Sequence, residues 1–302
     1  MPGVGNGHDE ASPDPTAVTQ LFSGDDGIRQ TLVSMKVIGV TVSANVLSPD
    51  QRAAGMCRSV PPTAVAIDFG SSFMGVWAAH RGTISAPCGD AFTSAGTLIR
   101  RGRIVDADGC VILLSQLIRR FSEPVPPGGV VAACRPVLAG EHEQTVMRRV
   151  VEAVLAPSRL GFIDTVRAAA IGSGAAAGSL LVTDVGAQLT EVALLDHGRI
   201  VAARRADIGT RDLARGATVD LVSDVVAHHL KALRGTTAQT QLAPALTRGL
   251  LLVGDGATHP GLSAALSAAL RLPVHRAVSP RTAALNGAGL AAMSLLRHPA
   301  PI

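Results

Sequence analysis

Two stretches of this sequence decide its fold: 63–85, TAVAIDFGSSFMGVWAAHRGTIS, and 179–205, SLLVTDVGAQLTEVALLDHGRIVAARR. Each begins with an apolar run that ends in Asp and is followed two residues later by Gly. A second apolar run, a tight turn containing Gly and a third run complete each stretch. Short β-rich runs bounded by glycine are typical of strands joined by hairpins. The two stretches therefore predict the same three-stranded unit twice.

The repeat keeps one spacing along its length. Equivalent residues lie 116 positions apart (184 − 68), and this offset also relates the two hairpin glycines. The equivalent pairs are Asp68 and Asp184, Gly70 and Gly186, Val76 and Val192, Gly82 and Gly198, and Ile84 and Ile200. Helix and strand patterns then follow each unit in the same order. We expect an α/β fold made of two related βββαβαβα halves.

Three parts are predicted along the chain. Residues 1–62 are rich in Gly, Pro, Asp and Ser and are expected to form a disordered arm. One apolar stretch in the arm, Val37 to Leu47, fits either a strand or a partner-binding segment. Residues 63–175 are expected to form a first lobe, which the closing helix 281–297 joins, and residues 176–280 a second lobe. Met35 and Met56 are alternative start sites.

Composition excludes several classes of protein. Aromatic residues make up 2% of the 302 residues and Tyr is absent, so we expect no stacking platform for single-stranded nucleic acid. No window reaches the roughly 18 apolar residues of a membrane-spanning helix. The start lacks a signal peptide, so a cytoplasmic location is expected. The four cysteines are too far apart for a zinc site and are interpreted as free thiols. Arg100, Arg101 and Arg103 are interpreted as a solvated loop.

The two Asp residues are the first candidates for a chemical role. Asp68 and Asp184 each stand at the end of an apolar strand, where a buried charge is costly unless it meets a cation or hydrogen-bond donors. Two carboxylates facing each other across a cleft would reach Mg²⁺ or its waters. The competing interpretation is that each Asp-x-Gly is only a hairpin turn.

The residues after each Asp are suited to binding phosphate. Gly70 and Gly186 permit a tight turn and let backbone N–H groups approach an anion. Ser71 and Ser72 add hydroxyl donors. Two such turns would hold a polyphosphate between them.

Small residues mark three further segments. Gly254, Asp255 and Gly256 follow the strand LLLV and precede a helix, where backbone can lie against a flat ligand and negative charge is favourable. The segments AAAIGSG (168–174) and AALNGAG (283–289) fit helices that cross closely at a hinge between lobes. Plain buried Ala-rich helices are the alternative.

At this point the motifs resemble a known family, the bacterial actin-like proteins of the MreB type, within the superfamily of actin, sugar kinases and heat-shock chaperone ATPases. AIDFGSS is similar to the first phosphate motif, TDVGAQLTEV to the second, and LLLVGDGATHPGL to the adenosine motif. FIDTVRAAAIGSG and SPRTAALNGAG resemble the two connecting helices, and 98–121 the stretch that leads into the first helix. The resemblance covers about residues 63 to 294.

The resemblance implies a two-lobed ATPase fold that binds ATP and Mg²⁺. Head-to-tail filaments or another homo-oligomer, contacts with a morphogenesis complex or another actin-like partner, and a role in rod shape and cell-wall synthesis are implied with it. A peripheral position at the inner membrane fits the same role. Asp68 and Asp184 would be metal ligands. The cofactor-binding set would be Asp68, Gly70, Ser71, Ser72, Asp184, Gly186, Ala187, Gly254, Asp255 and Gly256.

Three departures from the family pattern modify this expectation. Only 27 residues separate Ile84 from Val111 (111 − 84) and 40 separate Gly209 from Gly249 (249 − 209), so both outer subdomains are expected to be missing or reduced. The water-orienting Glu of the family is replaced by Thr165, a poor base, so hydrolysis should be slow or absent, with Asp184 as the other catalytic candidate. Ala187 and Gln188 replace glycines, which predicts a strained or reshaped second turn.

Two other functions remain open. A degenerate actin-like adaptor without nucleotide would use the arm to recruit a partner. A sugar-type kinase would need a carboxylate base, for which Asp90, Asp106 and Asp108 are the candidates.

Overall fold

The computed structural model describes residues 31–37, 40–46, 63–88, 97–234 and 239–298. Contacts divide the chain into two units, 1–59 and 60–302. In the first unit, β1 (Thr31–Val37) pairs antiparallel with β2 (Val40–Val46). The arm expected to be disordered therefore contains a strand pair. Its β2 matches the expected apolar strand, whereas β1 was not predicted.

The second unit contains two five-stranded sheets with the same topology. The first sheet has the order β5-β4-β3-β8-β9 and the second β12-β11-β10-β13-β14. The strands of the first are β3 (Ala64–Phe69), β4 (Phe73–Ala78), β5 (Gly82–Pro87), β8 (Val130–Arg135) and β9 (Arg159–Asp164). Those of the second are β10 (Ser179–Val185), β11 (Thr190–Asp196), β12 (Arg199–Ala206), β13 (Leu250–Val253) and β14 (Val274–Arg276). In each sheet two antiparallel hairpins adjoin two parallel strands.

The strand register confirms the duplication. Ile67 lies opposite Val76 in the first sheet, and Thr183 lies opposite Val192 in the second. Both members of the second pair follow those of the first by 116 residues (183 − 67 and 192 − 76). The spacing read from the sequence is therefore also the spacing of the hydrogen-bonded ladders.

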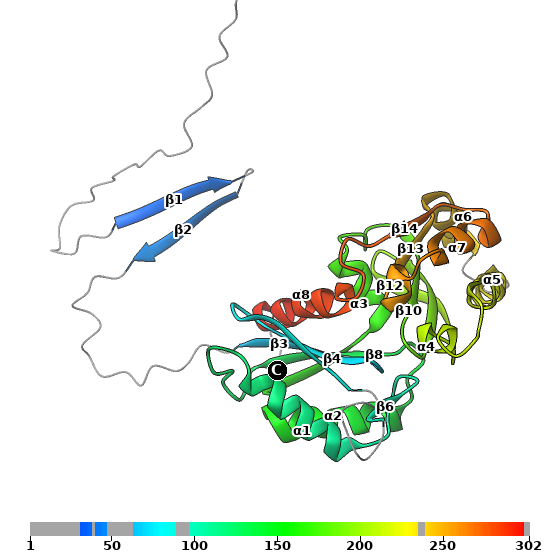
Figure 1. Cartoon of the computed structure of the whole chain (residues 1–302). Helices are drawn as coiled ribbons and strands as arrows, with labels where there is room; N and C mark the ends of the chain where they lie inside the picture. The colour runs from blue at the N-terminus through cyan, green and yellow to red at the C-terminus, as the bar shows by residue number, and fades with distance from the viewer. Residues whose placement is uncertain (1–30, 38–39, 47–62, 89–96, 235–238, 299–302) are drawn as a thin grey trace, which may run out of the picture. The chain divides into compact units, whose positions relative to one another are not determined.

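Helices cover the sheets in layers (Figure 1). Apolar side chains of α1 (Ala107–Arg119) and α2 (Glu141–Leu155) pack on one face of the first sheet. The corresponding face of the second sheet is covered by α5 (Val219–Arg234), α6 (Gln239–Arg248) and α7 (Leu262–Leu270). The inner faces share one core with α3 (Thr165–Gly172) and α8 (Ala283–Arg297). The two halves are thus joined through a common apolar layer.

Four short elements of the second unit were not predicted. The two-residue strands β6 (Ile99–Arg100) and β7 (Arg103–Ile104) form a hairpin, and α4 (Thr210–Leu213) and the 3-10 helix η2 (Asp255–Thr258) are single turns. Between β5 and α1, the described residues form only the β6–β7 hairpin. Residues 89–96 of this segment lie outside the described residues. The part between β12 and β13 holds α4, α5 and α6. This is the reduced outer architecture expected from the sequence.

The helices α3 and α8 cross at two glycines, as the small-residue segments predicted. A Cβ built on Gly287 would collide with the carbonyl oxygen of Ala168 and lie 2.8 Å from the backbone nitrogen of Gly172. A Cβ on Gly172 would likewise collide with the carbonyl oxygen of Ala283. Since rigid backbone stands on both sides, neither position accepts a larger residue.

Replacing Gly287 with Ala should therefore lower the free energy of unfolding by about 2 kcal/mol or more, because the helices must separate. Urea denaturation of the full chain measures the change. Gly140→Ala is the matched control: a Cβ there meets only the Glu143 carboxylate at 3.8 Å, so its effect should stay below about 1 kcal/mol. Equal effects of the two substitutions would contradict the close crossing.

Candidate functional site

A cleft of about 340 Å³ lies between the two sheets at the carboxyl ends of β3, β10 and β13. Chain segments from both halves line it, including both glycine turns and the start of α8. The predicted site residues that line it are Asp68, Gly70, Ser71, Ser72, Thr165, Asp184, Gly186, Ala187, Gly254 and Asp255. The structure thus brings together all the predicted residues except Gly256.

The first turn is held closely against its own hairpin. A Cβ on Gly70 would lie 2.6 Å from the Phe73 carbonyl oxygen, which explains the glycine without any special backbone angle. The Gly70 carbonyl accepts a hydrogen bond from the Cys88 thiol at 2.9 Å. The Ser71 hydroxyl accepts one from the Gly102 N–H at 3.4 Å, while Ser72 is half-buried. The turn is therefore fixed before any ligand binds.

The second turn is shaped by neighbouring backbone. Gly186 donates its N–H to the Leu189 carbonyl at 2.9 Å, and the Ala187 carbonyl accepts from the Arg211 N–H at 2.9 Å. Neither Ala187 nor Gln188 has a positive φ. Of the two outcomes expected when Ala187 and Gln188 replace glycines, strain is absent, because this backbone conformation accepts an L side chain; a reshaped turn stays a prediction.

Both carboxyl groups have raised pKa values, because burial and nearby negative charges oppose ionisation. Burial, with the negative charge of Asp255, raises the pKa of Asp68 to about 6. Burial, with the charges of Asp68 and Asp255, raises the pKa of Asp184 to about 7. The Asp184 Oδ1 atom is buried without a hydrogen-bond partner. A side chain on Gly254, whose φ is +83°, would collide with this oxygen. An unsatisfied carboxylate oxygen is the feature that a cation would satisfy.

The glycine cluster after β13 divides between two environments. Gly254 and Asp255 line the cleft, and Asp255 forms an ion pair with Arg281 at 3.1 Å. Gly256 is buried, and a Cβ there would lie 2.5 Å from the Val185 Cβ. Gly256 is not among the residues that line the cleft, and its lack of a side chain permits close packing of η2 on β10. The element that follows Gly254 is also a 3-10 turn rather than the start of an α-helix.

A third buried carboxyl group in the cleft was not predicted. Glu191 lies opposite Asp184 across β10 and β11 and is only 4% exposed. Its Oε1 accepts a hydrogen bond from the Val137 N–H at 2.5 Å, which links the second sheet to the first half. Burial, and then the charge of Asp184, raise the pKa of Glu191 well above its ordinary value. The signal was present in the sequence, since this Glu interrupts the apolar run of 190–195.

Thr165 lies in the cleft wall with its hydroxyl already used. It donates a hydrogen bond to the Arg135 carbonyl at 2.9 Å. The adjacent Asp164 forms an ion pair with the Arg135 side chain at 3.0 Å and is not among the residues lining the cleft. The described residues therefore place no carboxylate at the start of α3 facing the cleft.

The donor set fits a hard cation that keeps most of its water. Within the described part of the chain no three His, Cys, Asp or Glu residues gather closely enough to enclose a metal. Mg²⁺ in nucleotide sites binds one or two carboxylates together with phosphate oxygens and water. Asp68 and the unpaired oxygen of Asp184 match that requirement.

Cys88, Cys110 and Cys134 are free and buried, as expected, and Cys57 lies outside the described residues. No helix among the described residues is both long and apolar enough to cross a bilayer.

Comparison with known proteins identifies the fold. No known protein family matches the sequence, and no curated protein matches it. The structure is similar to MreB5 of Spiroplasma citri bound to AMPPNP, with a TM-score of 0.67 and 14% identity, covering 78% of this chain and 98% of that one. It is also similar to the ethanolamine utilization protein EutJ from Carboxydothermus hydrogenoformans, with a TM-score of 0.55 and 19% identity, covering 76% and 90%. The chain has the actin-like ATPase fold.

The raised pKa values predict how stability depends on pH without a cation. Because Asp68 and Asp184 hold protons more tightly when folded, their contribution is complete near pH 4 and is lost as pH rises through about 6 and 7. The loss should approach about 1.4 kcal/mol per pH unit for each group. Urea denaturation in EDTA between pH 4 and 8 measures it. Asp184→Asn should flatten the slope, while Asp224→Asn, on an exposed face of α5, should retain it.

Proposed function

We propose that this protein is a reduced MreB-like actin homologue that binds ATP with Mg²⁺ in the cleft between its two halves. It would act in cell shape or cell-wall morphogenesis, as a cytoskeletal or regulatory component. The observation that supports this most strongly is the buried, unpaired Oδ1 of Asp184 beside Asp68, with a glycine turn on either side. The MreB5 structures with AMPPNP and with ADP show that relatives of this fold hold nucleotides.

Each part of the cleft has a role in this proposal. The backbone of the turns at Gly70 and Gly186, with the hydroxyls of Ser71 and Ser72, would bind phosphate oxygens. Asp68 and Asp184 would hold Mg²⁺ or its waters, and Mg²⁺ would neutralise phosphate charge. The backbone at Gly254 would lie against the nucleoside, with the Asp255–Arg281 ion pair at its edge.

Hydrolysis should be slow because the cleft lacks a suitable base. The Thr165 hydroxyl donates to a backbone carbonyl, so it can accept from a water but cannot take its proton. Glu191 is fixed by the Val137 N–H and is protonated more readily than an ordinary Glu. Catalysis would rest on Asp184 and the bound cation alone.

The cellular part of the proposal follows the fold. Head-to-tail filaments or another homo-oligomer, a morphogenesis-complex or actin-like partner, and a cytoplasmic position at the inner membrane surface would accompany an MreB-like role. The reduced outer elements remove surface from one side of each half, so pelleting and electron microscopy are the direct tests of assembly.

One observation favours an adaptor without nucleotide as the second candidate. The turn between β6 and β7 contacts both phosphate turns, since Gly102 donates to the Ser71 hydroxyl and the Arg101 N–H donates to the Gln188 amide oxygen at 3.0 Å. A protein that no longer binds nucleotide could use these contacts to hold its halves together.

For a sugar-type kinase, Asp106 is committed to capping α1 and Asp90 lies outside the described residues.

Calorimetric titration of the full chain with Mg-ATP distinguishes the two candidates. The proposal predicts saturable binding that Asp68→Asn weakens at least about tenfold, because a charge-assisted cation contact is lost. Asp224→Asn should leave the affinity unchanged. Mg-ATP at 100 times Kd should also stabilise the fold by about 2.7 kcal/mol. An unchanged melting temperature and no heat of binding would favour the adaptor.

Turnover should remain below about 0.01 per second, the range of nucleotide switches without an external activator. A phosphate-release assay with saturating Mg-ATP measures it. Thr165→Val should leave this rate within about twofold, because the hydroxyl takes no part in proton transfer. A fast rate that Thr165→Val abolishes would show that Thr165 is catalytic.

A further inference from the structure

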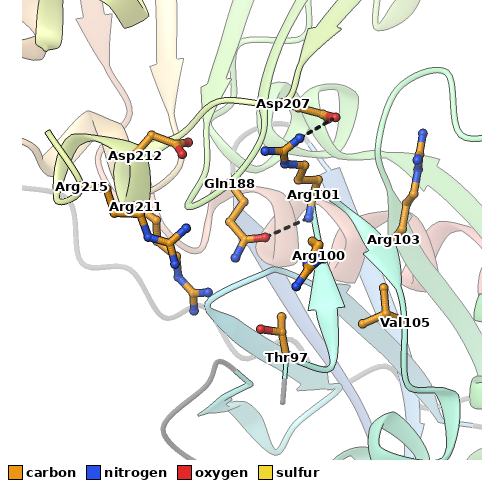
Figure 2. Close-up of a pocket in the computed structure, with 10 residues that line it drawn as sticks. All are labelled: Thr97, Arg100, Arg101, Arg103, Val105, Gln188, Asp207, Arg211, Asp212 and Arg215. Atoms are coloured by element: carbon orange, nitrogen blue, oxygen red, sulfur yellow. Dashed lines mark hydrogen bonds and ion pairs between the residues drawn. The ribbon is translucent and has the colours of Figure 1, made fainter. Parts of the chain in front are cut away.

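A second cavity, of about 600 Å³, opens beside the phosphate turns and is strongly basic. From the sequence, the arginines of 100–103 were interpreted as a solvated loop, but the fold places them opposite a second group of arginines more than 100 residues later. Figure 2 shows side chains of the β6–β7 hairpin and of the α4 region directed toward the same space. The lining residues are Thr97, Arg100, Arg101, Arg103, Val105, Gln188, Asp207, Arg211, Asp212 and Arg215.

The acidic groups nearby neutralise only part of this charge. Asp207 pairs with Arg101 at 3.3 Å, and Arg103 pairs with Glu143 at 2.7 Å. Asp212 accepts a hydrogen bond from the Gly209 N–H at 2.8 Å at the start of α4. Within the described residues, this leaves Arg100, Arg211 and Arg215 without an ion-pair partner.

Of these three arginines, Arg211 gives the strongest argument for a bound anion. Its Nη1 atom is buried and has no hydrogen-bond partner, a costly state for a charged donor. Its backbone N–H holds the Ala187 carbonyl, so the residue is anchored to the second phosphate turn. An anion in the cavity that Arg211 lines would offer this side chain an acceptor.

We propose that this cavity is a binding site for a small phosphorylated ligand, separate from the nucleotide cleft. Arg100, Arg211 and Arg215 would bind the phosphate, because guanidinium groups match phosphate oxygens in a two-pronged geometry. The volume suits a small molecule. Among the described residues, Gln188 alone lines both the cavity and the cleft, so the ligand would lie next to the nucleotide phosphates without using the same donors.

This site does not depend on the proposed nucleotide function. An anion bound by the arginines requires neither Asp68 nor Mg²⁺. The two sites can therefore be tested one at a time in the same full-length protein.

Calorimetric titration with pyrophosphate in EDTA is the test, because removing Mg²⁺ suppresses binding at the carboxylates. The full chain should bind pyrophosphate, and Arg211→Gln and the double variant Arg100→Gln/Arg215→Gln should each weaken binding at least about tenfold. Arg276→Gln, an exposed arginine of β14 outside the cavity, is the matched control and should bind as the parent does. Asp68→Asn should also retain binding.

Arg100 and Arg215 are exposed, so the double variant should melt at the same temperature as the parent protein. It therefore tests the proposal even if Arg211→Gln unfolds the protein. Parallel titrations with inorganic phosphate and with glycerol 3-phosphate distinguish a site for free phosphate from a site for an organic phosphate. Binding of either ligand that is lost in the double variant supports the proposal. Absence of binding at millimolar pyrophosphate, equal binding by the double variant, or binding only of an acidic peptide would overturn it.

Discussion

The fold depends on one electrostatic constraint: the buried Asp184 and the half-buried Asp68 face a common cleft at the ends of the central strands. Their pKa values rise because burial opposes charge in both, with the negative charge of Asp255 acting on both and that of Asp68 acting on Asp184. The surrounding backbone leaves room for these two carboxyl groups. Gly254 leaves room for the Asp184 oxygen, and the two glycine turns leave the space between the halves open to an anion. A cation with a phosphate chain would satisfy every one of these groups at once.

The same constraint explains how the halves are joined. A cleft lined by repelling carboxylates cannot hold the sheets together, so cohesion comes from the layer below it, where α3 and α8 cross at Gly172 and Gly287 within a shared apolar core. Hydrogen bonds beside the cleft also join the halves. Glu191 binds the Val137 N–H, and the Arg101–Gly102 turn contacts both phosphate turns. The two halves are therefore held together both by the apolar layer and by these hydrogen bonds beside the cleft.

The duplicated architecture was predictable because its signals are local. Strand alternation, Asp-x-Gly turns and a constant offset are visible within short windows, and the hydrogen-bond register reproduces them.

The β6–β7 hairpin was missed because two-residue strands carry no periodicity. Glu191 was missed although a charged residue inside an apolar run indicates a buried, hydrogen-bonded group. The arginine cavity could not be read from sequence at all, since its two halves, near residues 100 and 211, meet only through the fold. The place of Gly256 outside the cleft lining could not be predicted, because a glycine needed for packing and one needed for a ligand look alike in a motif.

The central claim is that a cation and a nucleotide discharge the repulsion between Asp68 and Asp184, and proton release measures this directly. At pH 6.5 these groups carry part of a proton each, since their pKa values are about 6 and about 7. Titrating preformed Mg-ATP into the protein in buffers of different ionisation enthalpy gives the number of protons expelled on binding. The account predicts net proton release near pH 6.5 that falls in Asp184→Asn. Binding without proton release, or with the same release in Asp184→Asn, would contradict it.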